Sequence, residues 1–467
     1  MISGKVDTKG FREGAFIGLE DIQLQSALHN INHFTIARDA ALAEIPDAAG
    51  LRDRFKQARD ATMSRLADYL EQFEENATRA GAVVHWASDG EEACRIVLKI
   101  AQSRGVKLAV KSKSMVTEEV HLNAALAKAG ITPVETDLGE YIIQLAEEPP
   151  SHIIAPAIHK TKAQVVKLLE SAAGKKLDDS IEALTAEARK LLREKFLSAG
   201  MGISGGNILV AETGSLVLVT NEGNGRMVTS VPPLHVALVG IEKVAPDWDV
   251  AAMWLSLLAR SATGQPMSVY TSILTGPARH NDIDGPEEVH IVLLDNGRSR
   301  LVGTKYEEVL HCIRCGACLN VCPVYRGTGG HAYGNPYSGP IGAVLAPLLF
   351  GREKFSGLPQ ASTLCGACLD VCPARIDLPR MLLEHRNDQV QAGQTPGIQA
   401  MAERVAAFGL SSHRLMQIGT GLGRMAPASM MQRLMPDTMF LGRTPPALAR
   451  KSFRKLWAEG EVDDLGT

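Results

Sequence analysis

The sequence lacks any run of about 18 apolar residues, the length that a membrane-spanning helix requires. The best candidate, Ile341–Phe350, is too short and contains Pro347. The N-terminal residues also lack the apolar core of a signal peptide. We therefore expect no integral membrane segment and a cytoplasmic location.

Excess positive charge is also missing, and aromatic residues are few. The chain has 49 Lys and Arg against 52 Asp and Glu, and aromatics make up 5% of its 467 residues. Binding to nucleic acid needs a basic surface, and base stacking needs aromatic side chains. The composition therefore predicts no nucleic-acid partner and gives no support to a DNA-binding iron–sulfur sensor.

Nucleotide-binding motifs are absent as well. Gly205–Asn207 lacks the glycine spacing of a dinucleotide site, and no phosphate-binding loop is present. Because no flavin motif is visible either, removal of hydride from a substrate would need chemistry elsewhere or a further cofactor.

The length predicts about three folding units. Residues 1–69 are expected to be helical, and a helical stripe of apolar residues runs through Leu51–Ala80. Residues 70–300 alternate short apolar runs with helical stretches, which predicts an α/β domain with a parallel sheet. The expected strands are 82–86, 106–110, 131–135, 153–154, 206–211, 214–220, 236–241, 267–273 and 289–294. The expected helices are 91–102, 117–128, 141–145, 160–169, 173–200 and 251–262.

Two later stretches have unusual compositions. Gly327–Gly342 contains six Gly and two Pro, which predicts a loop. Leu415–Phe440, within a helical extension of residues 386–467, carries six of the 15 Met. Methionine adapts to irregular surfaces, so this segment is either a docking surface for a partner or a loosely packed helical region.

Seven of the eight cysteines fall within the 61 residues from Cys312 to Cys372. Clustered cysteines in a reducing compartment indicate metal binding or redox chemistry. A C-x2-C-x2-C-x3-C-P run, as in the first motif here, is typical of bacterial ferredoxins. The first motif contains Cys312, Cys315, Cys318 and Cys322, and the second contains Cys365, Cys368 and Cys372. The remaining cysteine, Cys94, is expected to be a small buried side chain.

In two-cluster ferredoxins, the fourth cysteine of each run ligates the other cluster. The sequence therefore predicts one [4Fe–4S] cluster on Cys312, Cys315, Cys318 and Cys372. A second cluster would use Cys322, Cys365 and Cys368.

The second cluster lacks one thiolate, because Ser362 stands where a complete run would have cysteine. It is therefore either a [3Fe–4S] cluster or a [4Fe–4S] cluster with Ser362, water or a partner's donor as fourth ligand. Structural zinc is the alternative for all seven cysteines, but zinc sites usually use paired C-x2-C motifs.

Polar residues at predicted strand ends could line a pocket of the α/β domain. They are Lys111–Ser114, Glu212–Gly214 and Asn221–Arg226, and Lys111 with Glu212 could bind a carboxylate and move a proton. Ordinary turns and solvated loops explain the same residues. His331, in the glycine-rich stretch, could donate to a cluster sulfur or serve as a proton relay, or it is a surface histidine.

These motifs resemble one family, and the matching segments are as follows: Ala211–Ser215, His311–Cys318, Cys322–Arg326, Gly329–Gly334, Tyr337–Gly342, Ser362–Cys368 and Val371–Pro373. The chain is similar to lactate-utilisation protein B, the iron–sulfur subunit of the bacterial L-lactate oxidation system. The resemblance implies a sugar-isomerase or CoA-transferase-like fold for residues 70–300 and a ferredoxin-like two-cluster domain in residues 301–385. It also implies electron transfer during oxidation of L-lactate to pyruvate, with proteins A and C as partners.

Two other functions remain open from the sequence. The chain could carry electrons from another 2-hydroxy acid, such as glycolate, to an acceptor that the residues do not identify. Alternatively, the α/β domain could itself be catalytic, with CoA- or sugar-phosphate-type chemistry. On the leading interpretation, the chain is one subunit of an oxidoreductase complex and not a complete enzyme.

Overall fold

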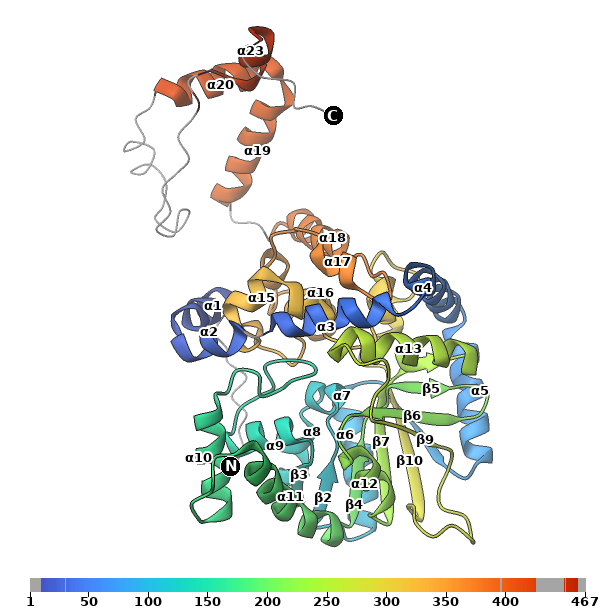
Figure 1. Ribbon diagram of the computed structural model, residues 1–467. Coiled ribbons are helices and arrows are strands. Elements are labelled where there is room, and N and C mark those ends of the chain that lie inside the picture. Colours follow the sequence, from blue (N-terminus) through green and yellow to red (C-terminus); the bar gives the residue numbers. More distant parts are fainter. Residues whose placement is uncertain (1–9, 30, 395–396, 426–448, 450, 461–467) are drawn as a thin grey trace. The chain divides into compact units, whose positions relative to one another are not determined.

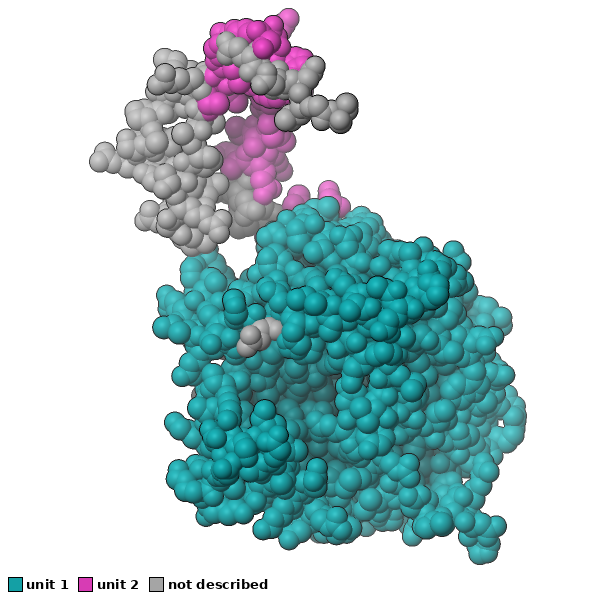
Figure 2. Space-filling model, viewed as in Figure 1, with its two compact units in different colours: residues 1–386 teal, residues 387–467 magenta. Residues whose placement is uncertain are grey.

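The computed structural model describes residues 10–29, 31–394, 397–425, 449 and 451–460 (Figure 1). The chain divides into two compact units, residues 1–386 and 387–467 (Figure 2). Within the described ranges, none of the helices combines the length and hydropathy needed to cross a bilayer.

A six-stranded parallel sheet forms the centre of the first unit, in the order β1-β10-β7-β4-β2-β3. Its strands are β1 (Val83–Ala87), β2 (Leu108–Lys111), β3 (Thr132–Glu135), β4 (Met201–Ser204), β7 (Leu234–Gly240) and β10 (Glu288–Leu294). Every residue of β4 and β7 is buried, as expected for a parallel sheet covered on both faces. The predicted parallel α/β fold is confirmed.

A second sheet of four strands has the order β8-β5-β6-β9. It contains β5 (Ile208–Val210), β6 (Ser215–Thr220), β8 (Val244–Ala245) and β9 (Tyr270–Leu274). The pairs β5–β6 and β6–β9 are antiparallel, whereas β5–β8 is parallel. The sequence indicated strands in this region but not their separation into a sheet of their own.

Helices cover both sheets. On one side, α6 (Gly90–Ser103) and α8 (Leu122–Lys128) share an apolar core with strands β4, β7 and β10. Elsewhere, α11 (Ile181–Ser198) packs on β2 and β3, and α13 (Trp248–Thr263) packs on the second sheet. The remaining helices of this domain are α7 (Met115–Glu119), α9 (Leu138–Leu145), α10 (Lys162–Ala173) and α12 (Asn224–Ser230).

The N-terminal helices and the cysteine region pack against the α/β domain through one continuous core. This core includes Phe55, Trp254, Leu310 and Tyr325, which come from distant parts of the chain. The N-terminal helices are α1 (Phe11–Glu20), α2 (Ile22–His29), α3 (Asn32–Ala43), α4 (Ala48–Ser64) and α5 (Leu66–Arg79). The cysteine region contains α14 (Ala317–Val321), α15 (Pro323–Thr328), α16 (Gly339–Phe350), α17 (Ala367–Val371) and the start of α18 (Leu378–Gln391). Figure 1 shows α3 running beside this region.

Two expected helices are each divided in the structure. The helix expected over Leu51–Ala80 breaks at Arg65, whose φ of −127° is not helical. The helix expected over 117–128 breaks at His121, which adopts a left-handed conformation with φ of 54°. In both places the apolar spacing continues across the break, so the pattern alone does not reveal it.

The strand expected at Ile153–Ile154 is wrong. The backbone N–H groups of Ile154 and Ala155 both donate to Nδ1 of His152, at 3.0 and 3.1 Å, and this side-chain-centred turn replaces a sheet ladder. Conversely, β4 lies between β2 and β7 in the sheet although no strand was expected there.

The loop expected over Gly327–Gly342 is correct only in its middle. Helix α15 ends at Thr328, a short 3-10 helix covers His331–Tyr333, and α16 begins at Gly339. In the second unit the described helices are α19 (Gly397–Ser411), α20 (His413–Met425) and α23 (Phe453–Ala458). Most of the methionine-rich stretch, residues 426–440, lies outside the described residues.

Candidate iron–sulfur centre

The two cysteine motifs adopt the same local backbone. In the first, Arg314 and Gly316 flank Cys315 with φ of 60° and 75°, and in the second, Leu364 and Gly366 flank Cys365 with φ of 54° and 84°. Each is followed by a five-residue helix, α14 or α17, that carries the next cysteine. Glycine suits these turns because it has no Cβ to clash in the left-handed region.

Four cysteines line one cavity: Cys312, Cys315, Cys318 and Cys372. The last of them comes from the second motif, so the two motifs interleave in space. Backbone N–H groups point at two of these sulfurs, because the N–H of Arg314 donates to Cys312 Sγ and that of Ile376 to Cys372 Sγ, both at 3.4 Å. Such hydrogen bonds to sulfur are part of the surroundings of iron–sulfur clusters.

The other three cysteines of the region form a second neighbourhood. The negative charges that raise the pKa of Cys368, after burial itself, come first from Cys322 and Cys365. Cys322 and Cys368 are buried, whereas Cys365 is exposed. Ser362 is half-buried, and its hydroxyl accepts a hydrogen bond from the N–H of Leu364 at 3.1 Å.

Burial and crowding disfavour thiolates in these two groups. Burial, and then the charges of Cys372 and Cys312, raises the pKa of Cys315 to about 12. Burial and the neighbouring sulfurs likewise raise the pKa of Cys372 to about 11 and that of Cys368 to about 12. Thiolates packed this closely become stable when a cation binds them, since a metal deprotonates its coordinating thiol. The residues therefore fit iron–sulfur clusters.

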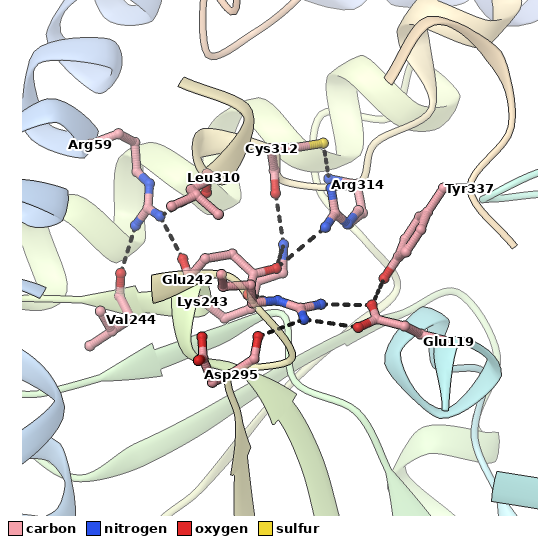
Figure 3. Close-up of polar contacts among 11 residues, drawn as sticks. Arg59, Glu119, Glu242, Lys243, Val244, Asp295, Leu310, Cys312, Arg314 and Tyr337 are labelled. Carbon is pink, nitrogen blue, oxygen red and sulfur yellow. Dashed lines mark hydrogen bonds and ion pairs between the residues drawn. The ribbon is translucent and has the colours of Figure 1, made fainter. Parts of the chain in front are cut away.

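Buried charges connect the first cysteine loop to the α/β domain (Figure 3). Lys243, just beyond β7, donates to the carbonyl oxygen of Cys312 at 2.7 Å. Its neighbour Glu242 lies 3.4 Å from the guanidinium of Arg314 and 3.7 Å from Lys243. Burial opposes the charge of Glu242, but Arg298, Lys243 and Arg314 together hold its pKa at about 2. The loop that carries Cys312 and Cys315 is thus fixed by strand-end residues.

Arg298 is the centre of this network. Its side chain is 1% exposed and forms two hydrogen bonds to Glu119, at 2.7 and 2.9 Å, and one to Glu242 at 2.7 Å. Tyr337, from the glycine-rich stretch, donates its hydroxyl to Glu119 at 2.5 Å. The buried ion pairs and hydrogen bonds around Arg298 fix the relative positions of the elements that contribute to them.

N-terminal arginines support the second motif from outside the α/β domain. Arg38 of α3 donates to the carbonyl of Val371 at 2.9 Å, and Arg52 of α4 donates to that of Cys372 at 2.7 Å. Both carbonyls lie at the end of α17, where helical carbonyls have no partner within the helix.

A turn at residues 151–155 joins the α/β domain to the first motif. Nε2 of His152 lies 3.0 Å from Oδ1 of Asn320. Asn320 is in α14, between Cys318 and Cys322 in the sequence. Tyr325 donates to the carbonyl of Ser151 at 2.9 Å. Glycine is required at Gly330, because a Cβ there would lie 1.7 Å from the same carbonyl oxygen.

A larger cavity of about 490 Å³ lies where the parallel strands end at their carboxyl side. Residues that follow four of the strands line it: Lys113 after β2, Asp137 after β3, Gly205 after β4 and Lys243 after β7. In open α/β sheets this edge is where ligands bind.

The first cysteine loop also contributes to this cavity. Ile153, Ile313 and Arg314 line both this cavity and the one lined by four cysteines, so the two spaces share a wall.

The three candidates for catalysis lie outside the large cavity. Lys111 is buried and paired with Glu135 at 2.8 Å and Glu118 at 3.0 Å. Glu212 is exposed, and its carboxylate accepts from the N–H of Trp248 at 3.3 Å. Two of the three predicted polar stretches do reach the cavity, through Lys113, Ser114, Asn221, Glu222 and Asn224. The third, Glu212–Gly214, does not line it.

His331 lies at a separate polar cluster. Its Nε2 is 2.8 Å from the carbonyl oxygen of Pro149, and its imidazole, His159 and Glu148 bring ligand atoms within 4.8 Å of one another. Lys160 already pairs with Glu148 at 2.5 Å, so this carboxylate has cationic partners without a metal ion.

Sequence reasoning missed Glu119, Glu242 and Arg298. The available signal was their position, because Glu242 and Arg298 follow closely on two buried strands, β7 and β10. An isolated charged residue after a strand is common on surfaces, so this signal is weak without the fold.

Two family descriptions match the chain. Residues 70–294 match the LUD domain, and residues 308–376 match the 4Fe-4S dicluster domain. The second match spans both cysteine motifs and supports iron–sulfur clusters as the group bound there.

Several curated proteins are similar over most of their length. Lactate utilization protein B of Bacillus pumilus is 44% identical over 90% of this chain and 89% of its own. The Bacillus subtilis protein of that name is 40% identical over 98% of each chain. The uncharacterized electron transport protein YkgF of Escherichia coli is 47% identical over 80% of this chain and 78% of its own. Among solved structures, a DUF162 family protein from Deinococcus radiodurans aligns with 49% of this chain, at 13% identity and a TM-score of 0.26.

Proposed function

This chain belongs to the lactate utilization protein B family, and on that basis we propose that it is the iron–sulfur, electron-transferring subunit of a system that oxidises L-lactate to pyruvate. The observation that carries the proposal is the convergence of Cys312, Cys315, Cys318 and Cys372 on one cavity. Four sulfurs from two interleaved motifs are the ligand set of a ferredoxin-type cluster.

The first cluster, a [4Fe–4S] cluster, is assigned to these four cysteines. Cys322, Cys365 and Cys368 are assigned to the second, which is a [4Fe–4S] or a [3Fe–4S] cluster. Ser362 is the candidate for its fourth ligand, because it stands three residues before Cys365 and its backbone carbonyl is fixed by Arg386 at 3.1 Å. Bound clusters of this type supply one-electron transfer.

The chain's own residues position and shield the sulfurs. Lys243 fixes the Cys312 carbonyl, Arg52 fixes the Cys372 carbonyl, and the N–H groups of Arg314 and Ile376 point at sulfur. Exposed Cys365 marks the surface at which a redox partner would approach, since electron transfer needs short distances. We expect the partners to be proteins resembling lactate-utilisation proteins A and C, together with an electron acceptor yet to be identified.

Iron and sulfide analysis with EPR tests the assignment of the clusters. Protein purified without oxygen should contain about seven or eight iron atoms per chain, as two clusters of these types require. Cys315→Ser should reduce that content and remove one EPR signal. Cys94→Ser is the matched control, because Cys94 is half-buried and donates only to the carbonyl of Val120, at 3.4 Å. Zinc in place of iron, or equal effects of the two variants, would refute the assignment.

A growth experiment tests the substrate. A strain in which the gene is deleted should lose growth on L-lactate, and the wild-type gene but not its Cys315→Ser variant should restore it. Growth on glycolate should be unaffected by the deletion. A defect on glycolate with normal growth on lactate would favour the alternative, an electron carrier for another 2-hydroxy acid.

A further inference from the structure

The large cavity contains two buried cationic atoms that are without a hydrogen-bond partner among the described residues. They are Nζ of Lys113 and one terminal nitrogen of Arg314. Lys113 forms only a distant ion pair, because its Nζ lies 4.0 Å from a carboxylate oxygen of Glu140. The other terminal nitrogen of Arg314 lies 3.4 Å from Glu242. Unpaired buried donors of this kind are costly, which favours an anion as their partner.

The acidic side chains that line the cavity are already occupied. Asp137 accepts the N–H of Glu140 at 3.1 Å, and Glu222 accepts the N–H of Leu138 at 3.1 Å. Both therefore bind the first turn of α9, and neither carboxylate forms an ion pair with Lys113 or Arg314 among the described residues, although the charge of Asp137 favours the charged form of Lys113. The third cation, Lys243, donates to the carbonyl of Cys312 at 2.7 Å.

One acceptor atom in the cavity is likewise free. Oδ1 of Asn224, at the start of α12, is buried and makes no hydrogen bond in the described part of the chain. Apolar side chains such as Met115, Ile153 and Leu258 form much of the remaining wall. A ligand that satisfies these groups has an anionic head, a hydroxyl donor and a short apolar body.

We propose that this cavity binds a small 2-hydroxy carboxylate, with Lys113 and Arg314 contacting the carboxylate and Asn224 accepting the hydroxyl hydrogen. The free terminal nitrogen of Arg314 can donate a charge-assisted hydrogen bond to a carboxylate, while the other terminal nitrogen stays with Glu242. A volume of about 490 Å³ lies within the range of about 300–1,000 Å³ typical of small-molecule sites. The choice of a 2-hydroxy acid rests on the proposed function, whereas the anion site itself does not.

The cavity lies next to the cavity that is lined by four cysteines. Because Ile313 and Arg314 line this cavity and also the one lined by four cysteines, a bound carboxylate would lie next to the first cysteine set. The α/β domain would then present the organic acid to the redox part of the same chain, and lactate would not need to bind only on a partner subunit.

Equilibrium dialysis tests the proposal directly. The full-length chain, purified without oxygen and with its clusters loaded, is dialysed against radiolabelled L-lactate, with pyruvate and inorganic phosphate as competitors. Lactate should bind to the chain, and pyruvate and phosphate should both bind more weakly than lactate. Lys113→Met should weaken binding by about tenfold or more, as expected for loss of a hydrogen bond to a charged group, and Lys113→Arg should retain most of it. Lys107→Met is the matched control, since Lys107 is an exposed lysine that does not line the cavity.

Iron content and thermal unfolding of each variant establish that it is folded and loaded. Absence of lactate binding to a loaded wild-type chain, or equal binding by Lys113→Met, would overturn the proposal. If pyruvate binds as tightly as lactate, Asn224 does not recognise the hydroxyl group. If phosphate binds more tightly than lactate, the cavity is a phosphate site instead. Iron content, EPR and growth on lactate test the electron-transfer function separately. A negative result in the dialysis experiment therefore does not refute that function.

Discussion

Replacement of Arg298 by methionine should destabilise the first unit strongly. The change removes the only arginine that contacts both Glu119 and Glu242 among the described residues, and it leaves two buried carboxylates. Methionine keeps much of the apolar part of the side chain, so the effect reports the loss of the charge together with its hydrogen bonds to the two carboxylates. Breaking a buried ion pair by removing one partner costs about 3–5 kcal/mol.

The pKa of Glu242 gives an independent magnitude. A carboxyl whose pKa is about 2 in the folded protein and 4.5 otherwise contributes about 3 kcal/mol above pH 4.5, and this contribution is lost as the pH falls toward 2. Arg298 is the strongest of the charges that lower this pKa. Without it, most of that contribution should disappear at neutral pH.

A protein of this size that contains iron–sulfur clusters is expected to unfold irreversibly, so its unfolding midpoint depends on the scan rate. Anaerobic calorimetry of both proteins at one scan rate therefore measures the effect. A loss of about 3 kcal/mol should lower the unfolding midpoint of this unit, residues 1–386, by roughly 3–4 °C. The control is Arg104→Met, which removes a surface pair with Glu288 and should cost about 1 kcal/mol or less. If both variants unfold at the same temperature, the buried network does not stabilise the fold as we reason.

Three further predictions concern other parts of the first unit. Burial lowers the pKa of His235 to about 4, so the unfolded chain binds this proton at a higher pH than the folded chain and stability falls between pH 7.5 and 5.5. A His235→Gln variant should lose about 1 kcal/mol less over that range, which appears as a smaller drop of the calorimetric midpoint at one scan rate. Gly202→Ala should destabilise by about 1–3 kcal/mol, because its Cβ would lie 1.9 Å from the carbonyl oxygen of Val228. Gly200→Ala, whose Cβ would meet Val106 at an ordinary 3.5 Å, should not; calorimetric midpoints at one scan rate compare them. For a wild-type chain that contains seven iron atoms, Ser362→Cys should raise the content to about eight by completing the second ligand set. An unchanged content would show that this position does not reach the cluster.

The cysteine motifs could be interpreted from sequence because their information is local. The spacing of Cys312, Cys315 and Cys318 fixes how a short stretch of chain presents its sulfurs, whatever the rest of the fold. The parallel sheet was equally accessible, since β7 and β10 are mostly apolar runs flanked by helical patterns.

Long-range features were not accessible in this way. Arg298 and Glu119 are 179 residues apart, and each alone resembles an ordinary surface charge. β4 contains Gly202 and Ser204 and has only four residues, so its strand character comes from its neighbours β2 and β7. Lys113 was named only as part of a polar stretch, because the lack of a hydrogen-bond partner for its buried Nζ becomes visible only in the folded structure.

The contacts of the first cysteine loop bear on how the domains act together. Lys243 and Glu242 come from the end of β7, the turn at His152 follows α9, and Arg38 comes from α3, yet all of them contact the cysteine region. A separate ferredoxin-like domain on a linker would need none of these contacts, because its own residues could hold the cysteine loops in place. The first cysteine set is therefore built into the edge of the sheet where α/β domains bind ligands. A domain arrangement of this kind is expected when ligand binding and electron transfer occur in one place, and it is not required for a carrier that only receives electrons from a partner.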